Sequence, residues 1–315
     1  YATTIPHLAF VAFQMTFAVI TPALITGAFV ERVRFKSFLI FTILWATLIY
    51  DPVAHWVWNV GGIFAKMGAL DFAGGTVVHI TAGFSALAFA LSIRQRRGYG
   101  KVAMEPHNIP YTVLGAGLLW VGWFGFNGGS ALASNGLAVV ALVNTNTAAA
   151  AAAVVWMLLS WRDKKPSVLG IVTGAVVGLV AITPASGYVT PLASIIIGAL
   201  AAPISFYMIQ YVHHRGLDES LDVFACHGMA GTFGALATGL FATTTINAAG
   251  RNGLFYGNPM QFVVQLVTVL ASAVFAFVIT FALTKAIDAI WGLSVSEQEE
   301  EVGLDISEHG ERAYA

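Results

Sequence analysis

The sequence contains very few charged residues. Asp, Glu, Lys and Arg make up 10% of its 315 residues, whereas soluble globular proteins contain about 25%. Hydrophobic residues account for 57%, and the mean hydropathy is +0.77. This composition excludes an ordinary soluble domain and indicates an integral membrane protein surrounded by lipids. No basic cluster is large enough to indicate a nucleic-acid partner.

Cysteine is almost absent. Cys226 is the only one, so an intramolecular disulfide is impossible. It lies beside His227 in an apolar run, and we expect a small buried packing residue rather than a metal ligand. No nucleophile–base pair or metal cluster predicts an enzyme, and we expect no cofactor.

Long hydrophobic runs are abundant and predict an all-α, polytopic membrane bundle. A helix crosses the roughly 30 Å hydrocarbon core with about 20 apolar residues. Gly and Ala interrupt several runs, which favours close helix packing. One transmembrane domain, residues 1–293, would precede a polar tail, residues 294–315. The nine expected spans are 7–30, 37–58, 76–94, 112–126, 137–161, 167–183, 191–212, 224–245 and 261–293.

Lysine and arginine predict the orientation of these spans. Only Lys66 and Arg251 lie in the loops after even-numbered spans. The positive-inside rule therefore places the tail in the cytoplasm and Tyr1 outside. The basic residues after odd-numbered spans are Arg32, Arg34, Lys36, Arg94, Arg96, Arg97, Lys101, Arg162, Lys164, Lys165 and Arg215.

Two stretches pair an aspartate with a histidine inside an apolar helix. The first runs from Asp71 to His79, and the second from Asp222 to His227. At about 1.5 Å per residue, His79 lies roughly 12 Å below Asp71, close to the bilayer midplane. Ionisable groups at that depth indicate a functional site. We expect both aspartates to cap a helix start and lock the adjoining loop rather than to bind an ion.

The two stretches also predict an inverted-topology repeat. Asp71 begins the third span on the outer face, and Asp222 begins the eighth on the inner face. Helices that are five spans apart run antiparallel, which is typical of secondary transporters. By this count the first half has two helices fewer than the second, so we expect a first hairpin to be missing from this chain.

With these motifs, the chain resembles the ammonium transporter family, the Amt/Mep/Rh group, over essentially its whole length. The matching motifs are DFAGGTVVHI at 71–80, GWFGFNGGS at 122–130, DVFACHG at 222–228 and GLDISEHGERAY at 303–314. The resemblance implies eleven spans in the family, a homotrimer with one pore per subunit and a location in the cell membrane. It also implies a tail motif that packs under the bundle and regulation by PII-type signalling proteins at the cytoplasmic face.

The same resemblance implies an outer ammonium site and a gate. Phe17, Trp58 and Ser130 match the vestibule where ammonium is recruited, and Phe17 and Phe126 match a stacked aromatic gate. Aromatic faces attract cations, and a hydroxyl oxygen accepts an N–H. Potassium, which is similar in size, has no N–H to donate.

The resemblance also implies the path beyond the gate. His79 and His227 match twin pore histidines, and Leu119 and Val223 match the apolar lining of the inner half. We expect ammonium to lose a proton before ammonia passes, with or without separate movement of the proton.

Other functions remain open on sequence alone. An Rh-like gas channel needs no cation site such as Trp58 and Ser130. An ammonium sensor would be expected to carry a larger signalling domain than residues 294–315. The tail glutamates Glu297, Glu299, Glu300 and Glu301, taken by themselves, predict a solvated acidic linker.

Overall fold

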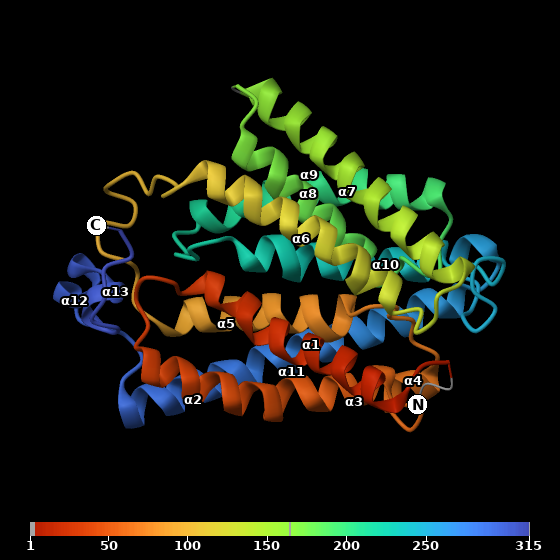
Figure 1. Cartoon of the computed structure of the whole chain (residues 1–315), viewed down its shortest axis with the longest axis horizontal. Coiled ribbons are helices and arrows are strands. Elements are labelled where there is room, and N and C mark those ends of the chain that lie inside the picture. The colour runs from red at the N-terminus through yellow and green to blue at the C-terminus, as the bar shows by residue number, and fades with distance from the viewer. Residues whose placement is uncertain (1–3, 164, 315) are drawn as a thin grey trace.

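A computed structural model describes residues 4–163 and 165–314 (Figure 1). Within these residues the secondary structure is helical, apart from a single β-bridge between Val33 and Ser294. Among the described residues, seven helical segments are long and apolar enough to cross a membrane. The predicted all-α membrane fold is therefore confirmed, while the count of nine spans stays a prediction.

Several spans are built from helical pieces joined end to end. The first consists of α1 (His7–Ile25) and η1 (Thr26–Ala28), and the second of α2 (Phe35–Trp45), η2 (Ala46–Tyr50) and α3 (Asp51–Trp58). A π-helical turn opens two others: η3 (Gly75–Ile80) precedes α5 (Thr81–Ser92), and η4 (Phe224–Met229) precedes α10 (Ala230–Phe241). The remaining helices are α4 (Ile63–Met67), α6 (Ile109–Gly129), α7 (Gly136–Asp163), α8 (Val168–Ile182), α9 (Pro191–His214), η5 (Leu254–Tyr256), α11 (Pro259–Trp291), α12 (Glu297–Val302) and α13 (Leu304–Ser307).

Local sequence explains where these helices begin. Asn108, Ser167 and Thr190 each accept the backbone N–H three residues later, at the starts of α6, α8 and α9. Such caps satisfy backbone donors that have no partner within the helix.

The helices form two groups, each with a large hydrophobic core, and a smaller cluster of Ile80, Ala235, Val269 and Ala273 joins the groups. Figure 1 shows α6 to α10 on one side of the molecule and α1, α2, α3, α5 and α11 on the other. One core is built from the second group, and the other joins α6 to α10. The π-helical turns η3 and η4 contact each other, so the histidine stretches meet where the groups join.

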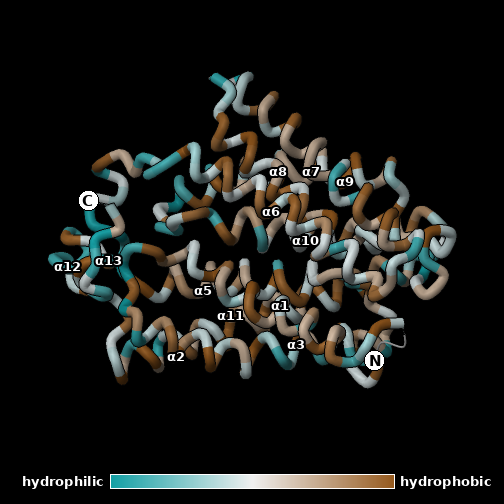
Figure 2. Tube along the Cα trace, in the orientation of Figure 1, coloured by the Kyte–Doolittle hydropathy of each residue, from teal (hydrophilic) through white to brown (hydrophobic). Residues whose placement is uncertain are grey.

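The tail packs against the loop that joins α1 to α2. Arg34 N–H donates to the Leu293 carbonyl at 3.0 Å, and Val295 N–H donates to the Arg32 carbonyl at 3.1 Å. Figure 2 shows hydrophilic residues gathered at the tail and hydrophobic residues along the long helices. The start of α1 and the tail lie at opposite ends of the long axis (Figure 1).

The tail glutamates lie in a helix rather than in a linker, although Glu297 and Glu301 are exposed to solvent as their charge predicted. Glu300 lies 2.5 Å from Arg94 and accepts the Arg97 backbone N–H at 2.7 Å. Glu299 completes a capping box with Ser296 at the start of α12. The acidic run becomes helical because basic side chains and a helix start provide partners for its carboxylates.

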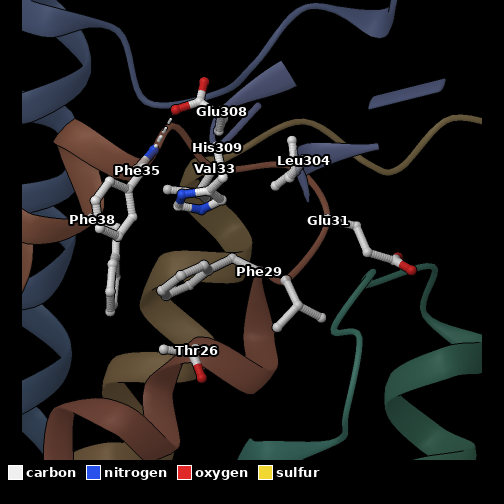
Figure 3. A pocket seen from close by; sticks show the side chains of 10 residues that line it. Thr26, Phe29, Glu31, Val33, Phe35, Phe38, Leu304, Glu308 and His309 are labelled. Atoms are coloured by element: carbon white, nitrogen blue, oxygen red, sulfur yellow. Dashed lines mark hydrogen bonds between the residues drawn. The ribbon is translucent and has the colours of Figure 1, made fainter. Parts of the chain in front are cut away.

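An apolar cavity of about 270 Å³ lies between the tail and the α1–α2 loop (Figure 3). Glu308 accepts the Phe35 backbone N–H at 3.0 Å, and the His309 ring meets the Phe35 ring edge-on at 4.8 Å. Phe29 and Leu304 also line the cavity (Figure 3). The tail is thus held by contacts at several points.

Candidate functional site

The two histidines meet in the buried interior. His79 in η3 and His227 in η4 are 1% and 9% exposed, and their Nδ1 atoms are 3.2 Å apart. Their helices cross closely at Gly83 and Gly228, where a Cβ on Gly83 would lie 2.1 Å from the Gly228 nitrogen. Only glycine permits the two helices to approach this closely, because a side chain would clash. The close crossing of the helices sets the distance between the histidine rings.

Asp71 secures the start of the helix that carries His79. Its carboxylate accepts four backbone N–H groups, from Gly74 at 2.9 Å, Gly75 at 2.6 Å, Thr76 at 2.8 Å and Val77 at 3.1 Å. Both carboxylate oxygens take part. These contacts are those of a group that holds a helix start, as expected for this aspartate.

The corresponding contact at the second histidine is made by Glu219, not Asp222. Glu219 Oε1 accepts the Phe224 N–H at 2.7 Å, whereas Asp222 Oδ1 lies 2.7 Å from His213 Nε2. The Asp222 carboxylate therefore does not cap the helix start, and its contact with His213 instead ties the turn before η4 to the end of α9, which is the loop-locking part of its expected structural role. Spacing could have identified Glu219, because it precedes His227 by eight residues, as Asp71 precedes His79.

A continuous row of rings leads from Trp58 to the histidines. Phe17 lies 5.4 Å from Trp58 and 4.7 Å from Phe126, and Phe126 lies 6.0 Å from His79, measured between ring centroids. Phe17 and Phe126 meet at 63° rather than face to face, which differs from the expected stacked pair. Trp123, which the sequence did not single out, stacks on His79 at 5.4 Å.

The polar atoms beside these rings have defined partners. Trp58 Nε1 donates to the Asp71 carbonyl at 2.9 Å, and Ser130 Oγ donates to the Phe126 carbonyl at 2.8 Å. Because a hydroxyl that donates its hydrogen keeps two lone pairs, Ser130 can still accept an N–H. The indole of Trp58 is held in place by Asp71, the residue that also caps η3.

The two residues expected to line the pore lie in different environments. Val223 is 3% exposed and lies beside η1, where a Cβ on Gly27 would come within 2.6 Å of its Cγ2. Leu119 on α6 is 43% exposed and belongs to neither hydrophobic core. The structure therefore buries Val223 and leaves Leu119 at the surface of this chain.

Chemically, the site can bind a hydrogen-bonding molecule without a metal. Within residues 4–163 and 165–314, no group of three or more His, Cys, Asp or Glu side chains is arranged to hold a metal ion. His79 Nε2 is buried and has no hydrogen-bond partner among the described residues. A neutral imidazole offers one donor and one acceptor nitrogen, so this atom can serve a guest molecule.

Known proteins resemble this chain over nearly its whole length. Residues 1–314 match the Ammonium Transporter Family. The chain is 52% identical to the ammonium transporter of Bacillus subtilis strain 168, over 100% of this chain and 78% of that protein.

Two solved structures share the fold. Mep2 of Candida albicans gives a TM-score of 0.88 at 37% identity, covering 94% of this chain and 68% of Mep2. A sensor Amt protein gives a TM-score of 0.86 at 29% identity, covering 94% of this chain and 75% of that protein. With this coverage and identity, the chain belongs to the ammonium transporter family, whose members are transporters rather than enzymes.

Proposed function

We propose that this protein transports ammonium by binding the ion at an outer aromatic site, removing a proton and conducting ammonia past His79 and His227. The observation that carries the proposal is the row of rings that ends at the buried histidine pair, with Nδ1 atoms 3.2 Å apart. Family membership supports ammonium as the substrate.

Trp58, Phe17 and Ser130 would recruit the ion. Aromatic faces attract a cation by about 0.5–2 kcal/mol per contact, depending on how far it is desolvated. The Ser130 oxygen accepts one N–H of ammonium, an interaction that potassium cannot make. Phe17 is buried between Trp58 and Phe126, so the ion would meet a closed ring contact directly after this site.

Beyond the rings, removal of a proton lowers the cost of passage. An ion pays a large desolvation penalty in an apolar path, whereas neutral ammonia pays much less. Val223 is an apolar residue on the inner side of the histidines in this proposal, and Leu119 would line the same half if another helix covered it.

The histidine pair would guide the neutral molecule. When both rings are neutral, one Nδ1 donates to the other, so one Nε2 keeps a hydrogen and the other Nε2 keeps a lone pair. Ammonia both donates and accepts hydrogen bonds, and it can therefore pass from one ring to the next. The unpartnered Nε2 of His79 supports this role.

The assembly and its surroundings form part of the same proposal. A homotrimer in the cell membrane, with the tail in the cytoplasm and a PII-type protein at that face, follows from the family resemblance. The transmembrane pore domain would be residues 1–293, and the regulatory tail residues 294–315.

His79→Ala and His227→Ala test the proposal in reconstituted vesicles. We expect ammonium conduction per assembled protein to fall, or its selectivity over potassium to collapse, by about tenfold or more, which corresponds to about 1.4 kcal/mol in barrier height. Cys226→Ala is the matched control, since Cys226 is a buried neighbour of His227. Wild-type conduction and selectivity in both histidine variants would refute a role in the pore.

A further inference from the structure

Glu219 is a buried carboxyl group that is only half satisfied. It is 2% exposed, and Oε1 accepts the Phe224 N–H at 2.7 Å. Oε2 is also buried but has no hydrogen-bond partner among the described residues. Asp71, at the same spacing from His79, uses both oxygens. The difference indicates that Glu219 does more than hold a helix start, because an unpaired ionised oxygen is costly to bury.

A short row of titratable groups lies near Glu219 and becomes more exposed along its length. Asp222 interacts electrostatically with Glu219 and contacts His213 at 2.7 Å. The side chains of Asp222 and His213 are 25% and 48% exposed. A proton on Glu219 therefore has neighbours that lead toward water.

The other charges around this row are mostly paired. Asp218, the residue before Glu219, lies 2.5 Å from Arg32 and 2.7 Å from Arg96. The Cys226 thiol interacts electrostatically with Glu219 and Asp222, and the Tyr99 phenol with Asp218 and Asp222. Arg32 and Arg96 are both engaged by Asp218, and Asp222 is paired with His213. Among the described residues, Glu219 is therefore the acid of this group that has no ion-pair partner.

The charge state of Glu219 fits a group that exchanges protons. Burial raises the pKa of Glu219 to about 8, and the Asp222 carboxylate adds to the rise, while the backbone N–H groups of Phe224 and Val223 and the His213 ring oppose it. A group whose pKa lies near the surrounding pH can both accept and release a proton readily.

We propose that Glu219, with Asp222 and His213, is the proton-exchange group at the tail-facing end of the His227 helix, and that it delivers to water the proton that ammonium loses. This inference rests on the proposed function. Ammonium becomes ammonia plus a proton; the Glu219 carboxylate takes that proton to form a carboxylic acid, and release through Asp222 or water restores the carboxylate. Glu219 lies in the turn before η4, eight residues ahead of His227 in sequence, so the proposal requires water molecules to carry the proton between them.

The test measures ammonium-evoked flux in vesicles that contain the protein with its C-terminal tail on the inside. The ammonium gradient is kept constant, and the inner pH is varied from about 6 to 9, a range that spans the Glu219 pKa of about 8. The wild type should show a flux that rises with inner pH, with a midpoint of about 8. Glu219→Gln cannot release a proton, so its flux should be lower and independent of inner pH. Glu105→Gln, in an exposed loop, should keep the wild-type profile. A wild-type profile in Glu219→Gln would overturn the proposal.

Two further measurements keep the result interpretable. If Glu219→Gln fails to fold, Glu219→Asp keeps a carboxyl group on a shorter side chain, and the midpoint should shift; an unchanged midpoint would count against the proposal. Infrared titration of the carboxylic-acid band in the wild type should show a group near pH 8 that is absent in Glu219→Gln. That titration does not require flux, so a protein with this band but no ammonium flux would contradict the proposed function and not the assignment of the titrating group.

Discussion

At the residue scale, two acids at equal spacing from two histidines have different surroundings. Asp71 is saturated by four backbone N–H groups, whereas Glu219 has one free buried oxygen. Saturation stabilises the ionised form, and an unpaired buried oxygen favours the protonated form. The two halves of the site therefore hold their histidines with acids that differ in how fully their carboxyl oxygens are hydrogen-bonded.

This difference predicts a pH-dependent stability for Glu219. Because its pKa is raised from 4.5 to about 8 in the folded protein, the folded state binds more protons than the unfolded state between these values. The wild type should lose stability relative to Glu219→Gln as pH rises through this range, by up to about 1.4 kcal/mol per pH unit, and then level off. Thermal unfolding of both proteins from pH 5 to 9 measures this difference in stability. A difference in melting temperature that does not change with pH would contradict the raised pKa.

A second residue-scale prediction concerns recruitment. Trp58→Leu removes the aromatic face beside Phe17, so transport should weaken about twofold to thirtyfold at low ammonium and much less at high ammonium, as expected for the loss of about 0.5–2 kcal/mol. Transport rates across a range of ammonium concentrations provide the measurement. Trp161→Leu, an exposed tryptophan on α7, is the control. An apparent affinity equal to that of the wild type would rule out a binding role for Trp58.

At the element scale, the tail is a docked structure rather than a free segment. Its helix α12 meets Arg94 and Arg97 in the loop after α5, and α13 brings Glu308 to the start of α2. The neighbouring loops are tied together because Asp218 joins Arg32 to Arg96. Although burial alone would raise it, the pKa of Asp218 is lowered by the hydrogen bonds from Arg96 and by the charge of Arg32.

This arrangement predicts which tail residue controls docking. Glu300→Ala removes the ion pair with Arg94 and the acceptor for the Arg97 N–H, so amide hydrogen exchange across residues 299–307 should increase about tenfold, as for a loss of about 1–2 kcal/mol. Glu297→Ala, an exposed residue on the same helix, should change exchange little. Equal protection in the wild type and Glu300→Ala would show that this contact does not hold the tail.

Deleting residues 303–315 tests whether docking affects transport. Removal of the Glu308 contact to Phe35 exposes the apolar cavity between the tail and α2. We expect the protein to remain in the membrane at its normal level while transport falls. Full transport by the truncated protein would mean that the tail and the pore are not coupled.

At the scale of the whole molecule, the loops gather at two ends. Figure 1 places α4 at one end and α12 at the other, and Arg94 and Arg97 contact α12. This arrangement is compatible with the predicted orientation, in which the basic loops share a side of the membrane with the tail. Tyr1, Lys164 and Ala315, which also entered that prediction, lie outside the described residues.

The orientation can be tested by labelling single cysteines from one side of the membrane. Lys101→Cys should react only from the cytoplasmic side and Lys66→Cys only from outside, since both residues are exposed. The reagent must be unable to cross the membrane. Cys226 is buried, so the parent protein should label weakly from either side. Reaction of Lys101→Cys from outside would overturn the positive-inside assignment and the inverted repeat that depends on it.

The sequence by itself determined the membrane class, the helical runs and the positions of the two histidines, because hydropathy and local spacing act along the chain. The family motifs supplied Trp58, Phe17, Phe126 and Ser130 as candidates. Only the tertiary structure decided which groups meet. It replaced Asp222 by Glu219 at the second helix start, added Trp123 beside His79, and paired the tail glutamates with arginines. Contacts of this kind join residues that are distant in sequence or whose relative position depends on a π-helical turn, and neither can be deduced from periodicity.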